Sequence, residues 1–512
     1  MSDPAGTSRH QEVERKFEPG PAVVLPSLAD VDGVSAVGQP VEAQLDAVYF
    51  DTADLDLAQH GVTVRRRTGG DDAGWHLKLP EGEDARTEVR LPLGRATRTV
   101  PAGLLAPVRA LVRDRPLTPV ARVRTRRLEY SVLDIDDVVL ATVCADDVQA
   151  ERLRAPGGER TWREWEVELV EGDRALLDRL GRRLLDAGAT SGTPSKLLRT
   201  LGDLVPLAPT RPSRKQLARG SAAQLVVAHL AEHNEQLHRQ DARLRAELPG
   251  SVHKMRIAAR RLRSALKTYR PLLEAGPADR VGDELRWLGQ VLAKARDAQV
   301  LREHLGRLVA AEPVELVLGP VSQRIDDDLR TEYRTGVEEG LAVLSAPRYF
   351  RLLDSLDELV LRPTFSERAD APAARVIPDL LGRDAKRMRR AVRKVAVAEA
   401  GARDAALHDA RKKAKRLRYA AESAVPLFPD RARKLATAAK RVQQALGEHQ
   451  DAVVSRSKLR EYGARAHSSG ENGFTFGRLH ALEDRRADDA VRRFESAWAH
   501  LERHTPARWK RT

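Results

Sequence analysis

The chain has 512 residues and carries 88 Lys and Arg against 74 Asp and Glu, which gives a formal net charge of +14. Hydrophobic residues make up 42% of the sequence, which is enough for a packed core and excludes a wholly disordered chain. Apolar runs are too short to cross a bilayer, and the first residues have no apolar segment typical of a secretory signal. The single cysteine excludes an internal disulfide and a cysteine zinc site, so we expect a soluble cytoplasmic protein.

The charge and the texture of the sequence both divide the chain in two. Residues 1–202 hold 28 basic and 33 acidic side chains, whereas residues 203–512 hold 60 basic and 41 acidic. Short β-like runs fill the first part, and long Ala-, Leu- and Arg-rich patterns of helical period fill the second. We therefore predict an α+β, two-domain fold, with an antiparallel β-rich domain at 1–202, a linker at 203–220 and an all-α domain at 221–512.

Several strands predicted in the first domain have one fully charged face, because side chains alternate across a strand. The sets that share a face are Glu12, Glu14 and Lys16; Arg65 and Arg67; Arg86, Glu88 and Arg90; Arg122, Arg124 and Arg126; and Glu164, Glu166 and Glu168. A half-exposed sheet would explain one such strand. All-carboxylate and all-arginine strands in one domain favour a barrel whose interior holds both charges, with acids binding a divalent cation and bases binding an anion.

The same residues resemble the CYTH superfamily, the triphosphate tunnel metalloenzymes. The matching motifs, in chain order, are Glu12-Val-Glu14-Arg-Lys16, Tyr49-Phe50-Asp51-Thr52, residues 61–67, Trp75-His-Leu-Lys78, Arg86-Thr-Glu88, Thr125-Arg126-Arg127, Asp146-Asp147, residues 162–169 and Ser195-Lys196. The resemblance covers about residues 8–202 and implies an eight-stranded antiparallel barrel around a polar tunnel. Thr142 stands where an acidic residue is expected, which bears on a second cation site and not on the first.

The resemblance also implies roles for individual residues. The expected ligands of Mg²⁺ or Mn²⁺, ions that prefer oxygen donors, are Glu12, Glu14, Asp146, Glu166 and Glu168. The residues expected to bind phosphate are Lys16, Arg65, Arg67, Lys78, Arg126 and Lys196. The residues expected to be catalytic are Glu12, Glu14, Lys16, Glu166 and Glu168, with no choice among the carboxylates for the group that orients the attacking water.

The helical part contains an internal repeat. Residues 252–263 align with residues 407–418, and in both copies a histidine is followed by basic residues at +3, +7, +8 and +10. Three prolines between residues 362 and 378 separate the copies. A repeat of this length predicts two duplicated helical bundles with a pseudo-two-fold axis, at about residues 221–362 and 375–505.

On a helix, each copy presents one basic face. The residues of these faces are His253, Arg256, Arg260, Arg263 and Lys267 in the first copy and His408, Arg411, Lys415 and Arg418 in the second. A solvated helix surface is the common meaning of such a row. Here few acids interrupt the rows, so the repulsion between neighbouring positive charges favours a ligand that relieves it. One histidine in each copy argues against a zinc site.

This second pattern resembles the CHAD domain over about residues 220–512, and Gly477-Arg478-Leu479-His480 matches it as well. The resemblance implies two helical bundles that face each other across a basic surface, with inorganic polyphosphate as the ligand. The combined hypothesis is a cytoplasmic, metal-dependent inorganic triphosphatase or polyphosphate-processing enzyme, held on its polymer by the helical domain. Association with polyphosphate granules is one version of it.

Other hypotheses remain open at this stage. One is a non-catalytic protein that binds polyphosphate or targets its granules, and another is a hydrolase or cyclase of an organic triphosphate such as thiamine triphosphate or ATP. Nucleic acid is a weaker candidate partner, because the basic helices lack interleaved aromatic residues for base stacking. The sequence indicates no membrane partner and gives no oligomeric state.

Overall fold

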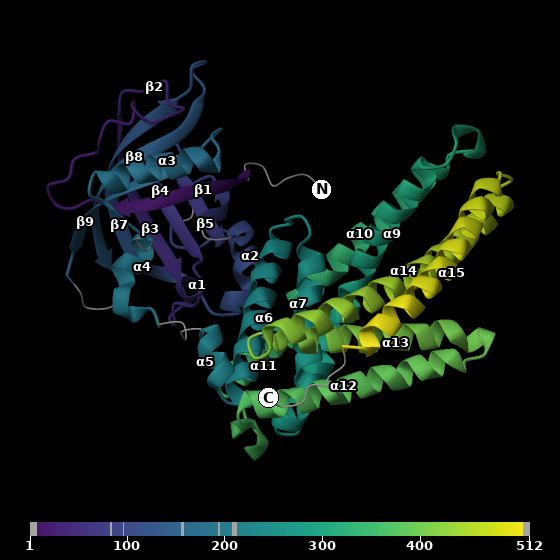
Figure 1. Cartoon of the computed structure of the whole chain (residues 1–512). Coiled ribbons are helices and arrows are strands. Elements are labelled where there is room, and N and C mark those ends of the chain that lie inside the picture. The colour runs from purple at the N-terminus through teal and green to yellow at the C-terminus, as the bar shows by residue number, and fades with distance from the viewer. Residues whose placement is uncertain are drawn as a thin grey trace. The chain divides into compact units, whose positions relative to one another are not determined.

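The computed structural model describes residues 8–81, 84–95, 97–154, 158–192, 195–206 and 212–504. The chain divides into two compact units, Met1–Thr210 and Arg211–Thr512 (Figure 1). Part of the segment predicted as a linker is helical instead. Ser213 and Gln216 form a capping box that starts helix α5 (Arg214–Arg219), which belongs to the second unit.

The first unit is an eight-stranded antiparallel barrel, as predicted. Its long strands follow the order β1-β6-β5-β4-β3-β7-β8-β9, and the β1–β9 pair closes it. The strands are β1 (Ser8–Glu18), β3 (Val41–Asp51), β4 (Thr63–Thr68), β5 (Gly74–Pro80), β6 (Ala85–Leu91), β7 (Thr118–Leu133), β8 (Val139–Arg152) and β9 (Arg160–Leu169). Two short strands, β2 (Ala36–Val37) and β10 (Thr190–Ser191), pair with β7 and β1.

Four helices accompany the barrel: α1 (Asp56–Gln59), α2 (Ala102–Val112), α3 (Arg174–Asp186) and α4 (Lys196–Leu201), followed by the 3₁₀ turn η1 (Gly202–Leu204). The apolar face of α3 covers the outside of β1, β8 and β9, where Phe17, Trp165 and Leu177 are buried together. A second apolar cluster joins α4 to the inner faces of β3, β7 and β8, and it includes Val123 and Leu197. The barrel interior is therefore apolar toward α4 and polar elsewhere.

The second unit is all-helical, as predicted. Its helices after α5 are α6 (Ala222–Arg245), α7 (Ser251–Thr268), α8 (Pro277–Val291), α9 (Ala293–Ala310), α10 (Val321–Leu344), α11 (Pro347–Leu361), α12 (Ala373–Ala396), α13 (Ala400–Ser423), α14 (Pro429–Ser468) and α15 (Phe474–Glu502), with 3₁₀ turns η2 (Arg270–Leu272), η3 (Val314–Leu316) and η4 (Glu367–Asp370). Packed neighbours recur in one order, since α6, α7 and α8 pack in sequence as α12, α13 and α14 do. The single helix α14 takes the place of the broken pair α8 and α9.

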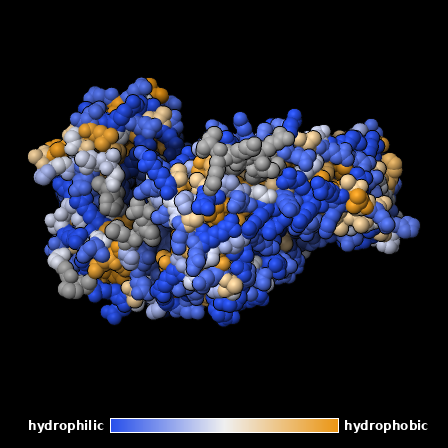
Figure 2. Space-filling model, turned by 60° about the horizontal axis from the view of Figure 1, so that its bottom comes forward, coloured by the Kyte–Doolittle hydropathy of each residue, from blue (hydrophilic) through white to orange (hydrophobic). Residues whose placement is uncertain are grey.

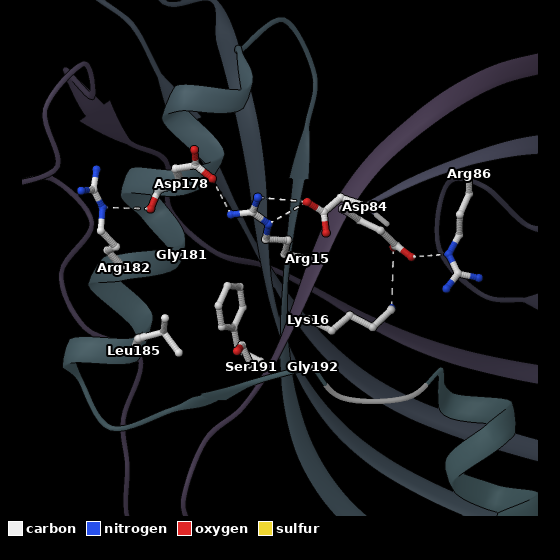
Figure 3. Close-up of a pocket in the computed structure, with 12 residues that line it drawn as sticks. Arg15, Lys16, Asp84, Arg86, Asp178, Gly181, Arg182, Leu185, Ser191 and Gly192 are labelled. Atoms are coloured by element: carbon white, nitrogen blue, oxygen red, sulfur yellow. Dashed lines mark hydrogen bonds and ion pairs between the residues drawn. The ribbon is translucent and has the colours of Figure 1, made fainter. Parts of the chain in front are cut away.

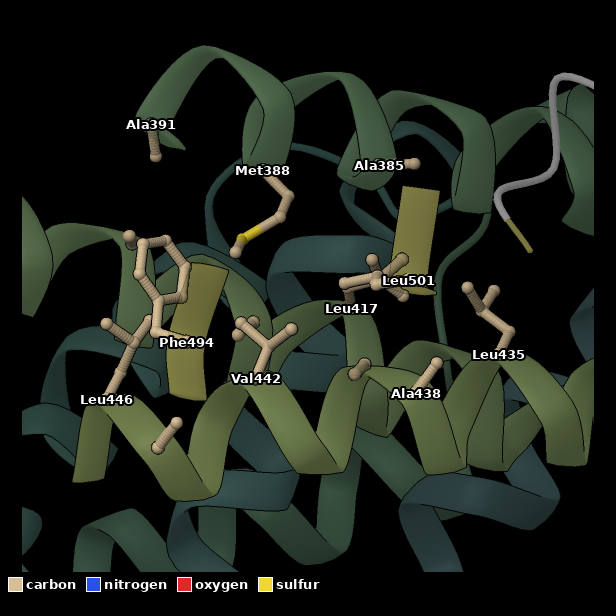
Figure 4. Close-up of a cluster of buried hydrophobic side chains, with 14 of the residues drawn as sticks. Ala385, Met388, Ala391, Leu417, Leu435, Ala438, Val442, Leu446, Phe494 and Leu501 are labelled. Carbon is tan, nitrogen blue, oxygen red and sulfur yellow. The ribbon is translucent and has the colours of Figure 1, made fainter. Parts of the chain in front are cut away.

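Among the described residues of this unit, two apolar clusters join its later helices. In Figure 4, Met388 of α12, Leu417 of α13, Val442 of α14 and Phe494 of α15 pack against one another. The other cluster joins α9 and α10 to α14 and α15, so the two halves of the unit share buried surface. The face shown in Figure 2 is predominantly hydrophilic. Across the described segments, no helix has both the length and the apolar character that a membrane span needs.

Candidate functional site

The polar part of the barrel interior is a cavity lined almost entirely by charged and polar side chains, which we call the tunnel site. Its lining residues are Glu12, Glu14, Lys16, Tyr49, Thr63, Arg65, Arg67, Asp72, Lys78, Arg86, Arg90, Arg127, Glu166, Glu168, Ser195 and Lys196. Most residues predicted to bind a metal or phosphate therefore meet in one cavity. Asp146 lies just behind this lining, and Arg126 is absent from it.

Strand β1 supplies two acids and one base, because every second side chain points into the barrel. Glu12 is 2% exposed, and its Oε2 lies 2.5 Å from Nζ of Lys78. Glu14 has two weaker partners: Nε of Arg86 at 3.3 Å and Nζ of Lys16 at 3.6 Å. The carboxylates of β1 are thus held close to cations from three strands.

Lys196 lies among three buried carboxylates. Ser195 caps α4 by accepting a hydrogen bond from the backbone of that helix, and this puts Lys196 in its first turn. Nζ of Lys196 is 2.6 Å from Glu164, 2.8 Å from Asp146 and 2.9 Å from Glu166. The carboxylate oxygens of these acids converge as metal ligands would, but the ammonium of Lys196 lies among them and offsets part of their charge. Asp146 is therefore engaged by lysine rather than open to a cation.

Arg127, and not Arg126, enters the tunnel site. Nη2 of Arg127 lies 2.7 Å from Asp146 and 2.6 Å from Glu166. Arg126 lies on the outer face of the barrel, where its Nε is 3.0 Å from Glu42. The prediction that Arg126 binds phosphate inside the tunnel is wrong.

The reason lies in the two faces of β7. Its inward face carries Ala121, Val123 and Thr125, which are buried. Its outward face carries Arg122, Arg124 and Arg126, which pair with Asp46, Glu151 and Glu42. Because the barrel interior is apolar near α4, the inward face of β7 carries no charge until Arg127. The all-arginine face predicted to line the interior therefore faces outward.

Glu14 and Glu168 oppose each other directly on the neighbouring strands β1 and β9. Such partners have Cβ atoms about 4.5–5.5 Å apart, so two carboxylates there repel each other. Glu168 forms no ion pair with a lysine or arginine of the described segments, and burial together with the Glu12 charge raises its pKa to about 7. Thr142 lies opposite Glu168 on β8 and adds a hydroxyl where an acid was expected. This carboxylate pair fits a divalent cation.

On the other wall of the tunnel site, Arg65 and Arg67 share the inner face of β4. Both guanidinium groups have a buried Nε without a hydrogen-bond partner. Burial, with the neighbouring Arg65 charge, lowers the pKa of Arg67 to about 9. Burial alone would lower the pKa of Arg65, but the charges of Tyr49 and Glu88, with the hydrogen bond that Arg65 donates to the Tyr49 oxygen, outweigh burial and raise this pKa. Arg67 is also ion-paired with Asp72, so the unpartnered Nε atoms are the donors suited to an anion.

The second unit brings its two repeated helices side by side. Nη2 of Arg416 on α13 donates to the backbone oxygen of Lys267 on α7 at 2.6 Å. Arg261 on α7 lies 2.7 Å from Glu422 on α13. These contacts set the spacing between the basic faces of α7 and α13.

Four of the predicted polyphosphate-binding residues meet between these helices: Arg256, Arg260, Arg411 and Lys415. We call them the central basic cluster. Burial, Arg411 and Arg260 together lower the pKa of Lys415 to about 7. The Nε atoms of Arg260 and Arg411 are buried without hydrogen-bond partners. Asp297 lies 3.0 Å from Arg256 and offsets part of the charge.

The other predicted residues of these faces have different surroundings. Arg418 is paired with Glu422 at 2.7 Å, and His408 is hydrogen-bonded to Gln450 at 2.6 Å. Burial, with neighbouring positive charges, lowers the pKa of both His253 and His408 and so disfavours the charged imidazolium. Arg263 and Lys267 continue the basic face along α7.

Comparison with known proteins agrees with both units. A family model of the CYTH domain matches residues 10–200, and one of the CHAD domain matches residues 228–460. An uncharacterised protein of Mycobacterium tuberculosis is 42% identical over 515 residues, which cover 97% of this chain and 97% of that protein. This chain belongs to the family of proteins that join a CYTH domain to a CHAD domain. Its first unit is a CYTH domain with the triphosphate tunnel fold, and its second unit is a CHAD domain.

Two solved structures also resemble parts of the chain. PptA from Streptomyces chartreusis shares 20% identity over 55% of this chain and 100% of its own, with a TM-score of 0.44. The CHAD domain from the plant Ricinus communis shares 25% identity over 56% of this chain and 93% of its own, with a TM-score of 0.43.

A groove in the wall of the CYTH barrel reaches the tunnel site from the side. It has a volume of about 750 Å³ and shares Glu14, Lys16 and Arg86 with the tunnel site. It opens beside the segment of β1 that lies between the residues paired with β6 and the residues paired with β10. Arg15 spans it, with Asp84 at 2.9 Å and Asp178 at 2.6 Å (Figure 3). The tunnel site therefore has a lateral approach.

Several functional residues of the CYTH unit were missed as site residues. Arg86 and Arg90 line the tunnel site, and their shared face with Glu88 was the signal that could have found them. Arg127 stands next to Arg126 in a quoted motif, so only the choice of face was in error. Tyr49 gave no charge signal, although its position in the motif of β3 pointed to it.

Proposed function

We propose that the CYTH unit is a Mg²⁺- or Mn²⁺-dependent phosphoanhydride hydrolase that acts on inorganic tripolyphosphate and on the ends of polyphosphate, and that the CHAD unit binds polyphosphate. The observation that carries the proposal is the composition of the tunnel site. Glu14 and Glu168 oppose each other on one wall, while Arg65 and Arg67 present buried cations on another.

The basic residues account for substrate binding. A short polyphosphate has several negative charges along an unbranched chain, and arginine guanidinium groups bind phosphate oxygens in a bidentate manner. The unpartnered Nε atoms of Arg65 and Arg67 leave donors for this purpose. Lys16 and Lys78 already lie near carboxylates, so their positive charge offsets the negative charge of those acids when an anionic substrate enters.

The acidic residues fit a hard divalent cation. CYTH domains generally depend on a metal, and the tunnel site offers the carboxylates of Glu12, Glu14 and Glu168. A cation between Glu14 and Glu168 would remove the repulsion of the opposed pair. When bound, Mg²⁺ or Mn²⁺ supplies charge stabilisation to the phosphate oxygens during hydrolysis.

The apolar end of the barrel favours attack at a chain terminus. Val123 and Leu197 belong to the cluster that fills the interior near α4, and Lys196 marks where the polar section begins. A linear polymer would enter this polar section end first.

The central basic cluster of the CHAD unit supports polyphosphate binding. Arg260 and Arg411 carry unpartnered buried donors, and the cluster has more cations than carboxylates in contact with them. A polymer of phosphates would relieve this repulsion over several neighbouring positions. Retention on cytoplasmic polyphosphate granules is an extension of the same proposal.

Orthophosphate release from tripolyphosphate, polyphosphate, ATP and thiamine triphosphate, with Mg²⁺ and with Mn²⁺, tests the proposal. Glu168→Gln should lower hydrolysis of tripolyphosphate by at least about tenfold and raise the metal concentration needed, because metal-site changes typically cost 10–100-fold. Asp147→Asn on the outer face is the matched control and should retain wild-type activity. Absence of hydrolysis of every substrate would overturn the proposal, and hydrolysis of an organic triphosphate alone would replace its substrate.

A further inference from the structure

Three side chains on α6 form a cluster outside the tunnel site and the central basic cluster. His229, Glu232 and His233 have the spacing i, i+3, i+4, which puts them on one face of the helix. Their candidate ligand atoms all lie within 4.8 Å of one another. The two imidazole rings meet edge to face, with centroids 4.5 Å apart.

These side chains have no competing polar partner. In the described part of the chain, none of the three forms a hydrogen bond or an ion pair with another residue. His233 is 5% exposed, and its Nε2 is buried without a hydrogen-bond partner. Buried polar atoms are almost always partnered, so this atom calls for an explanation. Glu232 is exposed, which gives an ion access to the cluster from solvent.

The protonation of the two histidines suits metal binding. Burial, with the charges of His233 and Arg261, lowers the pKa of His229 to about 3. Burial and Arg261 lower the pKa of His233 to about 4. Both imidazoles are thus neutral at pH 7, so a metal has no proton to displace. The positive charge of Arg261 opposes the binding of a cation at this cluster. The ion pair of Arg261 with Glu422, at 2.7 Å, offsets that charge.

We propose that His229, Glu232 and His233 bind a divalent first-row transition metal ion such as Zn²⁺. Two imidazole nitrogens and one carboxylate oxygen suit Zn²⁺, Co²⁺ or Ni²⁺, whereas the all-carboxylate donors of the tunnel site suit Mg²⁺ or Mn²⁺. Three protein ligands leave one tetrahedral position for water or an anion. Ligands at about 2.0–2.2 Å from the ion must draw together, and the exposed Glu232 side chain is free to rotate toward the histidines.

A Co²⁺ titration of the full-length protein tests this site. Chelator-treated protein is titrated in excess Mg²⁺, which saturates the carboxylates of the tunnel site, and binding is followed by visible absorption and by calorimetry with Zn²⁺. We expect one equivalent with the absorption of low-coordinate Co²⁺. Glu232→Gln should weaken binding at least tenfold, and His233→Asn should abolish it.

The chain offers a matched control. His500 and His504 form another i, i+4 histidine pair, with ring centroids 4.8 Å apart. His500→Asn should therefore leave the stoichiometry and the absorption unchanged. No binding by the wild-type protein would overturn the proposal, as would equal binding by Glu232→Gln or loss of binding in His500→Asn. Because Glu232 is exposed, Glu232→Gln should not disturb folding, so weaker metal binding by this variant reports the loss of a ligand. None of these measurements depends on hydrolase activity.

Discussion

A single partly buried lysine makes the CHAD unit sensitive to pH. Burial, Arg411 and Arg260 lower the pKa of Lys415 to about 7, whereas an unperturbed lysine titrates near pH 10.4. Between about pH 7 and 10.4 the unfolded chain binds more protons than the native protein at this residue. The destabilisation from Lys415 is therefore complete below about pH 7 and disappears as the pH rises through 10.4.

Polyphosphate binding at pH 8 should take up protons, because an anion beside Lys415 raises its pKa again. Calorimetry in two buffers of different ionisation enthalpy measures this uptake. Lys415→Met should reduce it, while Lys412→Met, an exposed lysine on the same helix, should not. Equal uptake by the Lys415→Met variant and the wild-type protein would contradict the pKa assigned to Lys415.

Most of the tunnel site could be predicted at the residue scale because the period of two in a strand fixes which side chains share a face. This period puts Glu12, Glu14 and Lys16 on one face, and the family resemblance placed that face inside the barrel. Arg126 was misplaced because a charged face can point to water or into a barrel. The choice depends on packing of Val123 and Leu197, which are far apart in the sequence.

At the scale of elements, the repeat predicted the basic faces of α7 and α13 but not every helix boundary. In the first repeat the helix is interrupted at Leu292, between α8 and α9. In the second repeat the corresponding helix, α14, is continuous. Neither copy has a proline at this point, so the local sequence gives no signal for the break. Helix ends without proline depend on tertiary contacts, which the period of the apolar residues does not report.

One close helix contact can be tested directly. A Cβ added to Gly336 of α10 would lie 2.6 Å from the backbone nitrogen of Ala295 on α9, so the helices would have to separate. Gly336→Ala should lower the free energy of unfolding by about 1–3 kcal/mol. Gly289→Ala on α8, where nothing lies within 4 Å, should raise it by about 0.5–1 kcal/mol. Denaturant unfolding followed by circular dichroism would contradict this packing if both substitutions stabilise.

At the scale of the whole molecule, the proposed function assigns both units to one kind of substrate. The uneven charge along the sequence and the helical repeat were enough to predict two domains of different class. Under the proposed function, the CYTH unit would recognise a phosphate chain through opposed charges inside a barrel, and the CHAD unit through positive charge on neighbouring helices. If both bind one polymer, the CHAD unit raises the concentration of long chains near the tunnel site.

Substrate length should therefore separate the two contributions. Replacing Arg260 and Arg411 together by alanine should raise KM for long-chain polyphosphate by about tenfold or more, because tethering is lost. Hydrolysis of tripolyphosphate should not change. A control that removes Arg390 and Lys394, both exposed on α12, takes away equal charge and should leave both substrates unaffected. A parallel change for both substrates would contradict the division of roles.

The most direct test of the tunnel site compares two adjacent arginines on β7. Arg127 lies inside beside Asp146 and Glu166, and Arg126 lies outside beside Glu42. With Mn²⁺ and tripolyphosphate, Arg127→Ala should lower kcat/KM on the order of 10²-fold, as loss of one stabilising donor typically does, while Arg126→Ala stays within about twofold. Thermal unfolding of both variants controls for folding. Equal activities of two folded variants, or a larger loss in Arg126→Ala, would contradict the account.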